Sequence, residues 1–201
     1  MIKKSNENND FLTQRHKSWQ LILAGTAALA LAMGIGRFAY TPILAFMMIE
    51  LGLTATEGGL IASWNFVGYC VGSLIPILPL FNGYLKIWFF AAVATSILTT
   101  ALMGLPLDVT FLALIRFVSG IASAFTLIFG TSLILPSIQA LGKISISTRH
   151  FVGVGLGMAI SSIVVSSMGA FNFYWDELWY GVAIAALILA LPVIVLSLIH
   201  I

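Results

Sequence analysis

Two arginines lie inside stretches of sequence that are otherwise apolar enough to cross a membrane. Arg37 occurs in GIGRFAYTP, residues 34–42, and Arg116 occurs in LALIRFVSGIASA, residues 112–124. A charged side chain near the centre of a bilayer costs at least about 2.5 kcal/mol, and such residues usually face protein or water along a solute or ion pathway. These two guanidinium groups are therefore the candidates for binding an anion.

The positions of the two arginines along their helices predict similar depths in the membrane. At about 1.5 Å per residue, Arg37 lies about 25 Å along a helix that begins near residue 20, and Arg116 lies about 10 Å along a helix of opposite direction. Apart from Glu57, His150 and His200 at the ends of predicted spans, no predicted span contains Asp, Glu or His. Two interpretations stay open: a water-filled cavity that admits an anion, or guanidinium groups that bond backbone carbonyls, helix ends or the acid of a partner.

Other polar and small residues occur near the arginines at helical spacing, and residues three or four apart share a helix face. The candidate solute-binding residues are Arg37, Tyr40, Asn65, Tyr69, Arg116 and Ser123. Glycines accompany them, and we expect these glycines to allow close helix packing, because small residues dominate helix contacts in membranes. The predicted packing positions are Gly34, Gly68, Gly72, Gly120, Gly153 and Gly157.

No arrangement of residues suited to catalysis or metal binding appears in the sequence. His16 and His150 lie in polar segments and His200 lies at the terminus, away from any carboxylate inside a span. Cys70 is the single cysteine, so no internal disulfide can form, and we expect it to be a packing residue. We therefore expect no cofactor, no metal and no enzymatic activity. The net charge of +2, without a basic cluster, also argues against nucleic-acid binding.

The composition predicts an integral membrane protein. The 201 residues are 60% hydrophobic and 8% charged, with a mean hydropathy of +1.08, whereas soluble domains carry roughly 25% charged residues. A spanning helix needs about 20 apolar residues. Six such stretches occur, and we expect helices at about 20–48, 57–80, 85–106, 109–135, 148–170 and 178–200.

The polar residues 1–18 are predicted to be a short tail, followed by one transmembrane bundle over residues 19–201. A cleaved signal peptide is disfavoured because the first apolar stretch is longer than the roughly 7–15 residues of a signal sequence. Lys and Arg outside the spans occur in the tail and in the second and fourth connections, which all lie on one side. Because cytoplasmic segments collect Lys and Arg, we expect both termini in the cytoplasm and the chain in the cell inner membrane.

The predicted spans differ in polarity. The third and sixth, 85–106 and 178–200, carry almost no polar side chain beyond small hydroxyls, and we expect them to face lipid all round. The other four carry the glycines and the polar groups. This division predicts an inner set of four helices and an outer set of two.

Three stretches, GIGRFAYTPIL, GLIASWNFVGYCVGSL and GVGLGMAISS, together resemble the YbfB/YjiJ-type branch of the major facilitator superfamily. Leu112, Arg116 and Gly120 match the fourth-helix motif of that superfamily. The resemblance implies an all-α membrane protein whose six transmembrane helices form two inverted three-helix repeats, one half of a facilitator-type fold. It also implies that the first, second, fourth and fifth helices line or gate a cavity and that Arg116 takes part in substrate or proton coupling.

The sequence departs from the superfamily pattern in two ways. The connection LFNGYLKIW, residues 80–88, carries Lys86 alone, where the superfamily has an Asp and several bases. Six spans are also half of what such transporters contain. We therefore expect a truncated N-terminal half that, with a missing C-terminal six-helix half, moves a small solute across the lipid bilayer by alternating access. The alternatives are a half-transporter that acts only as a dimer and a six-helix membrane scaffold without transport.

Overall fold

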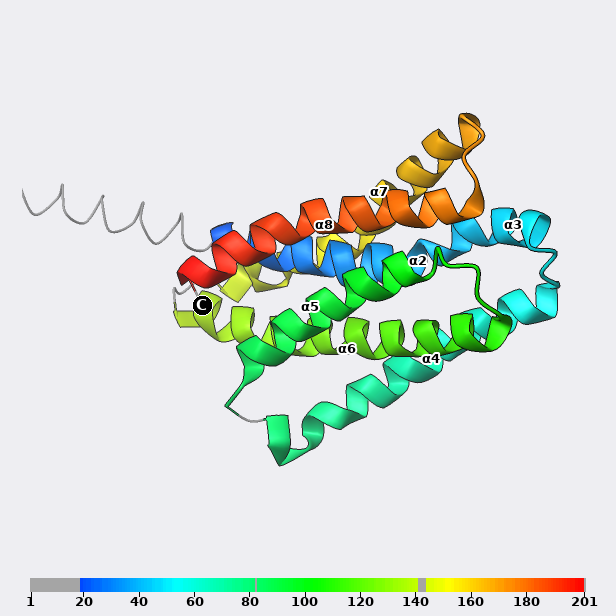
Figure 1. The fold of residues 1–201 in the computed structure, drawn as a ribbon. Helices are drawn as coiled ribbons and strands as arrows, with labels where there is room; N and C mark the ends of the chain where they lie inside the picture. Colours follow the sequence, from blue (N-terminus) through cyan, green and yellow to red (C-terminus); the bar gives the residue numbers. More distant parts are fainter. Residues whose placement is uncertain (1–18, 82, 141–143, 201) are drawn as a thin grey trace, which may run out of the picture.

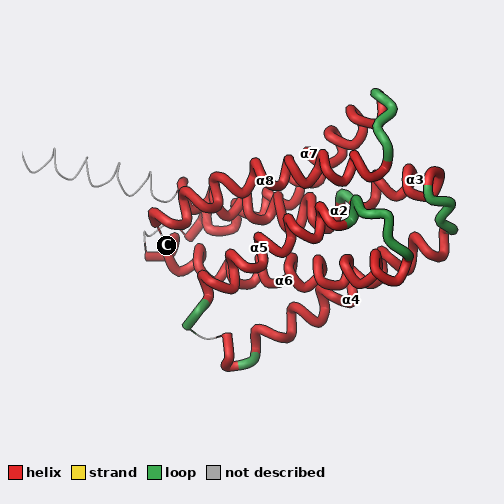
Figure 2. The backbone as a smooth tube through the Cα atoms, viewed as in Figure 1, coloured by secondary structure: helices red, strands yellow, loops and turns green. Residues whose placement is uncertain are grey.

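A computed structural model of the chain describes residues 19–81, 83–140 and 144–200, so the predicted tail at 1–18 lies outside the described residues. Within these ranges the chain forms helices and turns and no strand (Figures 1 and 2). Six of its helices are long and apolar enough to cross a membrane: Trp19–Glu50, Ala55–Ile77, Leu85–Leu102, Val109–Pro136, Thr148–Ala170 and Trp175–Val195. The predicted all-α, six-span membrane architecture is confirmed, and the inverted repeat stays a prediction.

The first span, Trp19–Glu50, is called helix one here, and it is not a regular α-helix. It is α-helical to residue 29, continues as the π-helix η1 (Ala30–Ile35) and the short α2 (Gly36–Phe38), and ends with α3 (Tyr40–Glu50). The later elements are α4 (Ala55–Leu74), η2 (Ile75–Ile77), η3 (Pro79–Phe81), α5 (Leu85–Leu102), α6 (Val109–Ala140), η4 (Ile144–Phe151), α7 (Val152–Ala170) and α8 (Trp175–His200).

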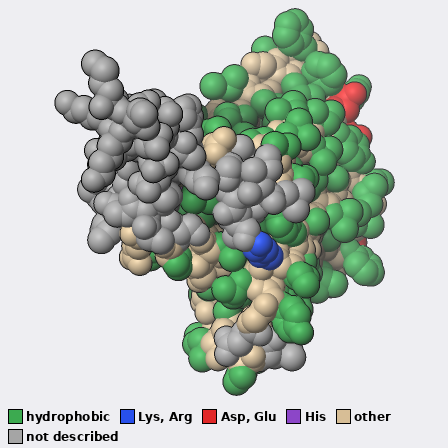
Figure 3. Space-filling model, turned by 90° about the vertical axis from the view of Figure 1, so that its left-hand side faces the viewer, with side chains coloured by type: hydrophobic (Ala, Val, Ile, Leu, Met, Phe, Trp, Pro, Cys, Tyr) green, Lys and Arg blue, Asp and Glu red, His purple; other side chains and the backbone are tan. Residues whose placement is uncertain are grey.

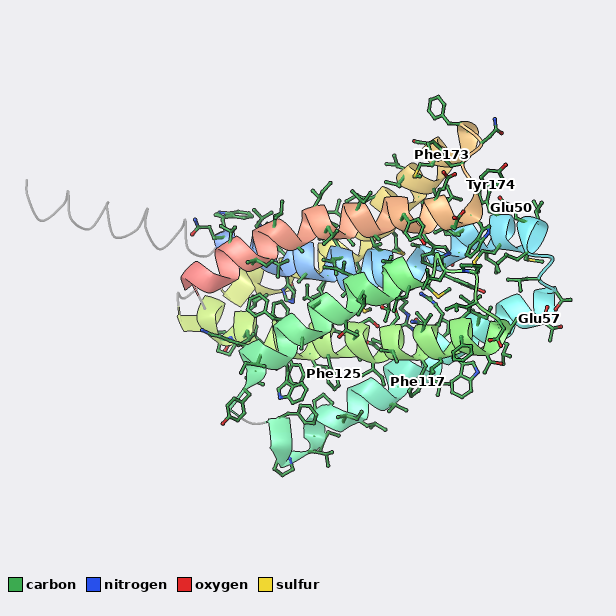
Figure 4. The ribbon with its side chains drawn as sticks, in the orientation of Figure 1. Glu50, Glu57, Phe117, Phe125, Phe173 and Tyr174 are labelled. Carbon is green, nitrogen blue, oxygen red and sulfur yellow. The ribbon has the colours of Figure 1, made fainter. Side chains whose placement is uncertain are left out.

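Helix one runs through the middle of the bundle, between α8 on one side and α5 and α6 on the other (Figure 1). The C-terminal ends of α3, α5 and α7 lie at one end of the bundle, and those of α4 and α6 lie at the opposite end (Figure 1). Glu50 and Glu57 lie at the first of these ends (Figure 4). Seen from the other end, the described part of the surface is coloured mainly as hydrophobic and uncharged, with Lys or Arg and Asp or Glu side chains in small patches (Figure 3). Charges therefore gather at helix ends, as a bilayer requires.

Local sequence explains where several helices begin and end. The turn before α4 uses Gly52 at a φ of +68°, which a residue without Cβ adopts at no steric cost. The helix then begins at a capping box, in which the Thr54 hydroxyl oxygen accepts from the Glu57 amide at 3.2 Å and the Glu57 carboxylate accepts from the Thr54 amide at 2.9 Å. By contrast, α6 passes through Pro136 instead of stopping at residue 135 as expected, because neighbouring groups can compensate for the lost backbone bond in a membrane helix.

Close contacts between backbones hold the helices in two pairs, and each of the predicted packing glycines lies at one of these contacts. On α4 and α6, a Cβ added to Gly68 would collide with the Phe117 carbonyl oxygen, and one added to Gly120 would collide with that of Asn65. Gly72 packs on the backbone of Ile121 in the same pair.

The second pair joins helix one to α7. A Cβ at Gly157 would collide with the Ala30 carbonyl oxygen, and one at Gly153 would collide with that of Thr26. Gly34 lies directly against the backbone of Gly157. Small residues thus bring the backbones of helix one and α7 into direct contact, which gains van der Waals energy where lipid supplies no hydrophobic driving force.

Burial is distributed differently from the predicted inner and outer sets. In helix one, 72% of the most apolar stretch is buried, but the corresponding share is 22% for both α4 and α7 and rises to 33% for α5 and 39% for α8. One face of α8, with Leu178, Trp179 and Val182, is fully buried. On α5, Phe89, Ser96 and Thr100 are buried as well. The prediction that the third and sixth spans face lipid all round is therefore wrong for both, because an apolar side chain suits a protein contact as well as lipid. Cys70, predicted as a packing residue, is exposed on α4.

Candidate functional site

Arg116 joins α6 to helix one immediately after the π-helical segment. Its Nη1 donates to the Gly36 carbonyl oxygen at 2.8 Å, and its Nη2 donates to the Arg37 carbonyl oxygen at 2.8 Å. Ser119, one turn further along α6, donates from its hydroxyl to the same Gly36 oxygen at 3.1 Å. Wide π turns are rare and frequently occur at functional sites. Here the π turn is followed directly by two backbone carbonyls that accept hydrogen bonds from Arg116 on α6.

The surroundings of Arg116 are closed to solvent. The side chain is only 3% exposed, and its guanidinium carbon lies 4.9 Å from the centre of the Tyr40 ring. Tyr40 is itself buried and donates from its hydroxyl to the Gly58 carbonyl oxygen at 2.9 Å, which ties helix one to α4. The structure thus gives Arg116 the backbone partners that the second interpretation of the sequence described.

Arg37 has a different environment, on a side of helix one that faces α4. Its guanidinium carbon lies 4.3 Å from the centre of the Tyr69 ring and 4.5 Å from that of Phe66, both within the range of cation–π attraction. The side chain is half-buried, and its Nε is buried without a hydrogen-bond partner among the described residues. Because Phe66 is 55% exposed, the Arg37 site lies at the edge of the bundle and not in its interior.

The remaining candidate residues lie inside the bundle. The Asn65 amide nitrogen donates to the Arg116 carbonyl oxygen at 2.9 Å, and the Ser123 hydroxyl donates to the Gly120 carbonyl oxygen at 2.8 Å. Both side chains are fully buried, and the side-chain oxygen of Asn65, Oδ1, is buried without a hydrogen-bond partner among the described residues. The structure therefore brings Arg37 and Tyr69 together at an open surface and places Arg116, Asn65, Tyr40 and Ser123 behind them.

Three contributors to this region were not predicted. The Gly36 carbonyl and the Ser119 hydroxyl belong to the bond network around Arg116, and Phe66 covers Arg37. Ser119 is three residues after Arg116 in the sequence, a helical spacing that could have indicated it. The π-helix has no such signal, since ALAMGI differs little from the small and apolar residues around it. In the part of the chain that the structure describes, no cluster of three His, Cys, Asp or Glu could hold a metal ion.

Comparison with known proteins gives one match. The family described as "Uncharacterised MFS-type transporter YbfB" matches residues 29–200, which include helix one from the start of its π segment and every later helix. No curated protein matches the chain, and no solved structure matches it.

Proposed function

The chain belongs to the YbfB family of MFS-type transporters, and from this membership we propose that it forms the solute-binding bundle of a transporter for a small organic anion, with Arg37 as the anion-binding group. The family match and the six apolar helices support a membrane transporter. The observation that supports an anion is the environment of Arg37, which is half-buried between aromatic rings with a buried and unpartnered Nε.

The two arginines have different roles in this proposal. Arg116 already donates to two backbone carbonyls and holds helix one in place, so it positions the site. The Nε–H of Arg37 is buried without an acceptor among the described residues, and the guanidinium lies over the rings of Phe66 and Tyr69. A guanidinium stacked in this way can still present donors at its edge, where a carboxylate or sulfonate would bind in the same plane. Because Arg37 supplies a single guanidinium, the site favours a singly charged anion.

The exposed helices suggest where the rest of the transporter meets this bundle. Although α4 and α7 carry glycines, an asparagine and several serines, only 22% of their most apolar stretches is buried. We propose that the side of α4 beside Arg37 faces a second six-helix bundle, and that the solute binds between the two bundles. Alternating access then follows from rocking one bundle against the other around this site. If the second bundle were another copy of this chain, the site would contain two Arg37 side chains. A C-terminal half without that charge therefore suits the binding of a monoanion better than a dimer does.

Arg37→Ala tests the role of the guanidinium. We expect the variant to bind benzenesulfonate, a probe that stays anionic at any pH near neutral, more weakly by about 2–5 kcal/mol, roughly 30-fold or more, because a partly buried charge loses its partner. Isothermal titration with the protein in lipid nanodiscs measures this change. Arg37→Lys is the matched control, and we expect it to retain part of the affinity because it keeps the charge but not the planar donors. Equal affinity of Arg37→Ala and the unchanged protein would contradict the proposal.

A further inference from the structure

Helix one is interrupted at Ala39, and neither the glycine contacts nor the proposed anion site requires an interruption there. The α-helical conformation of α2 stops at Phe38, and α3 begins at Tyr40. Pro42 lies in the first turn of α3 and has no N–H, so it cannot donate to the Phe38 carbonyl oxygen four residues earlier, and its ring crowds that carbonyl. Prolines and π turns are two of the usual causes of sharp bends in helices, and helix one contains both on either side of Ala39.

The part of helix one before the interruption, residues 19–38, is called its first segment here, and it is held by α6 and α7. Arg116 of α6 donates to the carbonyl oxygens of Gly36 and Arg37, each at 2.8 Å, just before the interruption. On α7, Gly157 lies directly against the backbone of the same segment. Charge-assisted hydrogen bonds are among the stronger ones in proteins, so the first segment is firmly attached on both of these sides.

The part of helix one after the interruption, α3, makes its hydrogen bonds to other helices. Tyr40 donates from its hydroxyl to the Gly58 carbonyl oxygen of α4 at 2.9 Å. Glu50, at the far end of α3 (Figure 4), accepts from the backbone amide of Trp175 at the start of α8 at 3.1 Å. These hydrogen bonds therefore divide at Ala39, since those before it join helix one to α6 and those after it join helix one to α4 and α8.

The packing of the two parts of helix one differs in the same sense. A Cβ added to Gly157 would meet the backbone of the first segment. By contrast, a Cβ added to Gly58 of α4 would meet the end of the Leu44 side chain on α3, and one added to Gly169 of α7 would meet the Phe46 ring on α3. Side chains can change rotamer while a backbone contact cannot adjust without moving the helix. Of the two parts, α3 can therefore move with less repacking.

We propose that helix one bends at Ala39, and that α3 moves as a unit about this point while the first segment stays attached to α6 and α7. The 11 residues of α3 are about 16 Å long at 1.5 Å per residue, so a bend of about 30° displaces the far end of α3 by about 8 Å.

The bend would uncover buried polar groups beside the interruption. Tyr40 is the first residue of α3, and its ring centre lies 4.9 Å from the guanidinium carbon of Arg116. The Nε of Arg116 and the Oδ1 of Asn65 are buried without a hydrogen-bond partner among the described residues. Movement of the Tyr40 ring would let water reach Arg116, and a hydrogen bond gained by a buried unpaired group favours the bent state. The proposal does not depend on the anion site.

A pair of spin labels measures the bend and needs no solute. Ile49 near the end of α3 is 83% exposed and Phe111 on α6 is 57% exposed, so labelled cysteines at these two positions disturb little packing. The protein carries Cys70→Ser, which removes its single native cysteine, and is placed in lipid nanodiscs. Electron–electron double resonance then gives the distribution of distances between the labels. We expect this distribution to spread over about 8 Å.

Pro42→Ala restores the N–H that can donate to the Phe38 carbonyl oxygen, and we expect it to make the distribution about half as wide. Pro192→Ala is the matched control, because Pro192 lies inside α8 and its replacement leaves helix one unchanged. Alanine favours a helix more than proline does, so both variants should fold. The same width in Pro42→Ala as in the labelled protein with Pro42, or an equal narrowing in Pro192→Ala, would overturn the proposal.

A second variant acts in the opposite direction. Tyr40→Phe keeps the ring but removes the hydroxyl that joins α3 to the Gly58 carbonyl oxygen. We expect the displaced position of α3 to become about threefold more populated relative to the position in the structure, because one hydrogen bond that favours the latter is lost. A distribution that does not shift would count against the proposal. Failure of benzenesulfonate to bind would count only against the anion site, because no label measurement uses it.

Discussion

Arg116→Ala is expected to lower the free energy of unfolding by about 3–5 kcal/mol, because it removes two charge-assisted hydrogen bonds and leaves a cavity in the bundle. The guanidinium donates to the carbonyl oxygens of Gly36 and Arg37, each at 2.8 Å. Without it, the segment that follows the π-helix loses its connection to α6 apart from the Ser119 hydroxyl. Unfolding in mixed detergent, followed by circular dichroism, measures the change.

Arg116→Met separates the hydrogen bonds from the volume of the side chain. Methionine fills much of the space but donates no hydrogen bond, so we expect it to recover the cavity contribution only. Arg116→Lys keeps the charge but cannot bond both carbonyls in the planar geometry of a guanidinium, so we expect intermediate stability. If the methionine protein is as stable as the unchanged protein, the bonds from Arg116 to helix one do not hold the bundle together.

Gly157→Ala is expected to have a comparable effect, about 3 kcal/mol, at the contact of helix one with α7. The new Cβ would collide with the Ala30 carbonyl oxygen and lie 2.7 Å from the Cα of Gly34. Both obstacles are backbone atoms, so relief requires the two helices to move apart, which places the cost at the upper end of overpacking. The same unfolding experiment measures it.

Gly155→Ala is the matched control on the same helix. A Cβ at Gly155 would meet nothing within 4 Å. We expect unchanged stability or a gain of up to about 1 kcal/mol, since alanine favours a helix more than glycine does. A similar loss of stability in both variants would mean that the glycines of α7 do not act through contact with helix one.

The features that depend on composition and spacing could be predicted from the sequence. Six apolar stretches with polar connections indicate six spanning helices, and the structure has them. The importance of Arg37 and Arg116 follows from the high cost of a charge in an apolar span. Glycines at helical spacing indicate close packing in the same way, and Gly68 and Gly120 indeed lie between the same two helices.

The orientation of the side chains could not be predicted. A regular helix would turn 100° per residue, but the π-helix at Ala30–Ile35 widens that turn, and this changes the direction of each later side chain relative to the earlier ones. Arg37 consequently faces Phe66 and Tyr69, while Tyr40 is buried beside Arg116. Hydropathy also does not distinguish a helix face that contacts lipid from one that packs against protein. The burial of α8 and the exposure of α4 and α7 could therefore be learned only from the packed structure.

The most direct test of the account is whether the protein recognises negative charge. Benzenesulfonate and the uncharged benzenesulfonamide have nearly the same shape, and each is titrated into the unchanged protein in lipid nanodiscs, with empty nanodiscs to correct for partition into lipid. We expect benzenesulfonate to bind at least about ten times more tightly than the sulfonamide, since only the anion gains a charge-assisted hydrogen bond from Arg37. Equal affinity for the two compounds, or binding of neither, would contradict an anion site in this bundle.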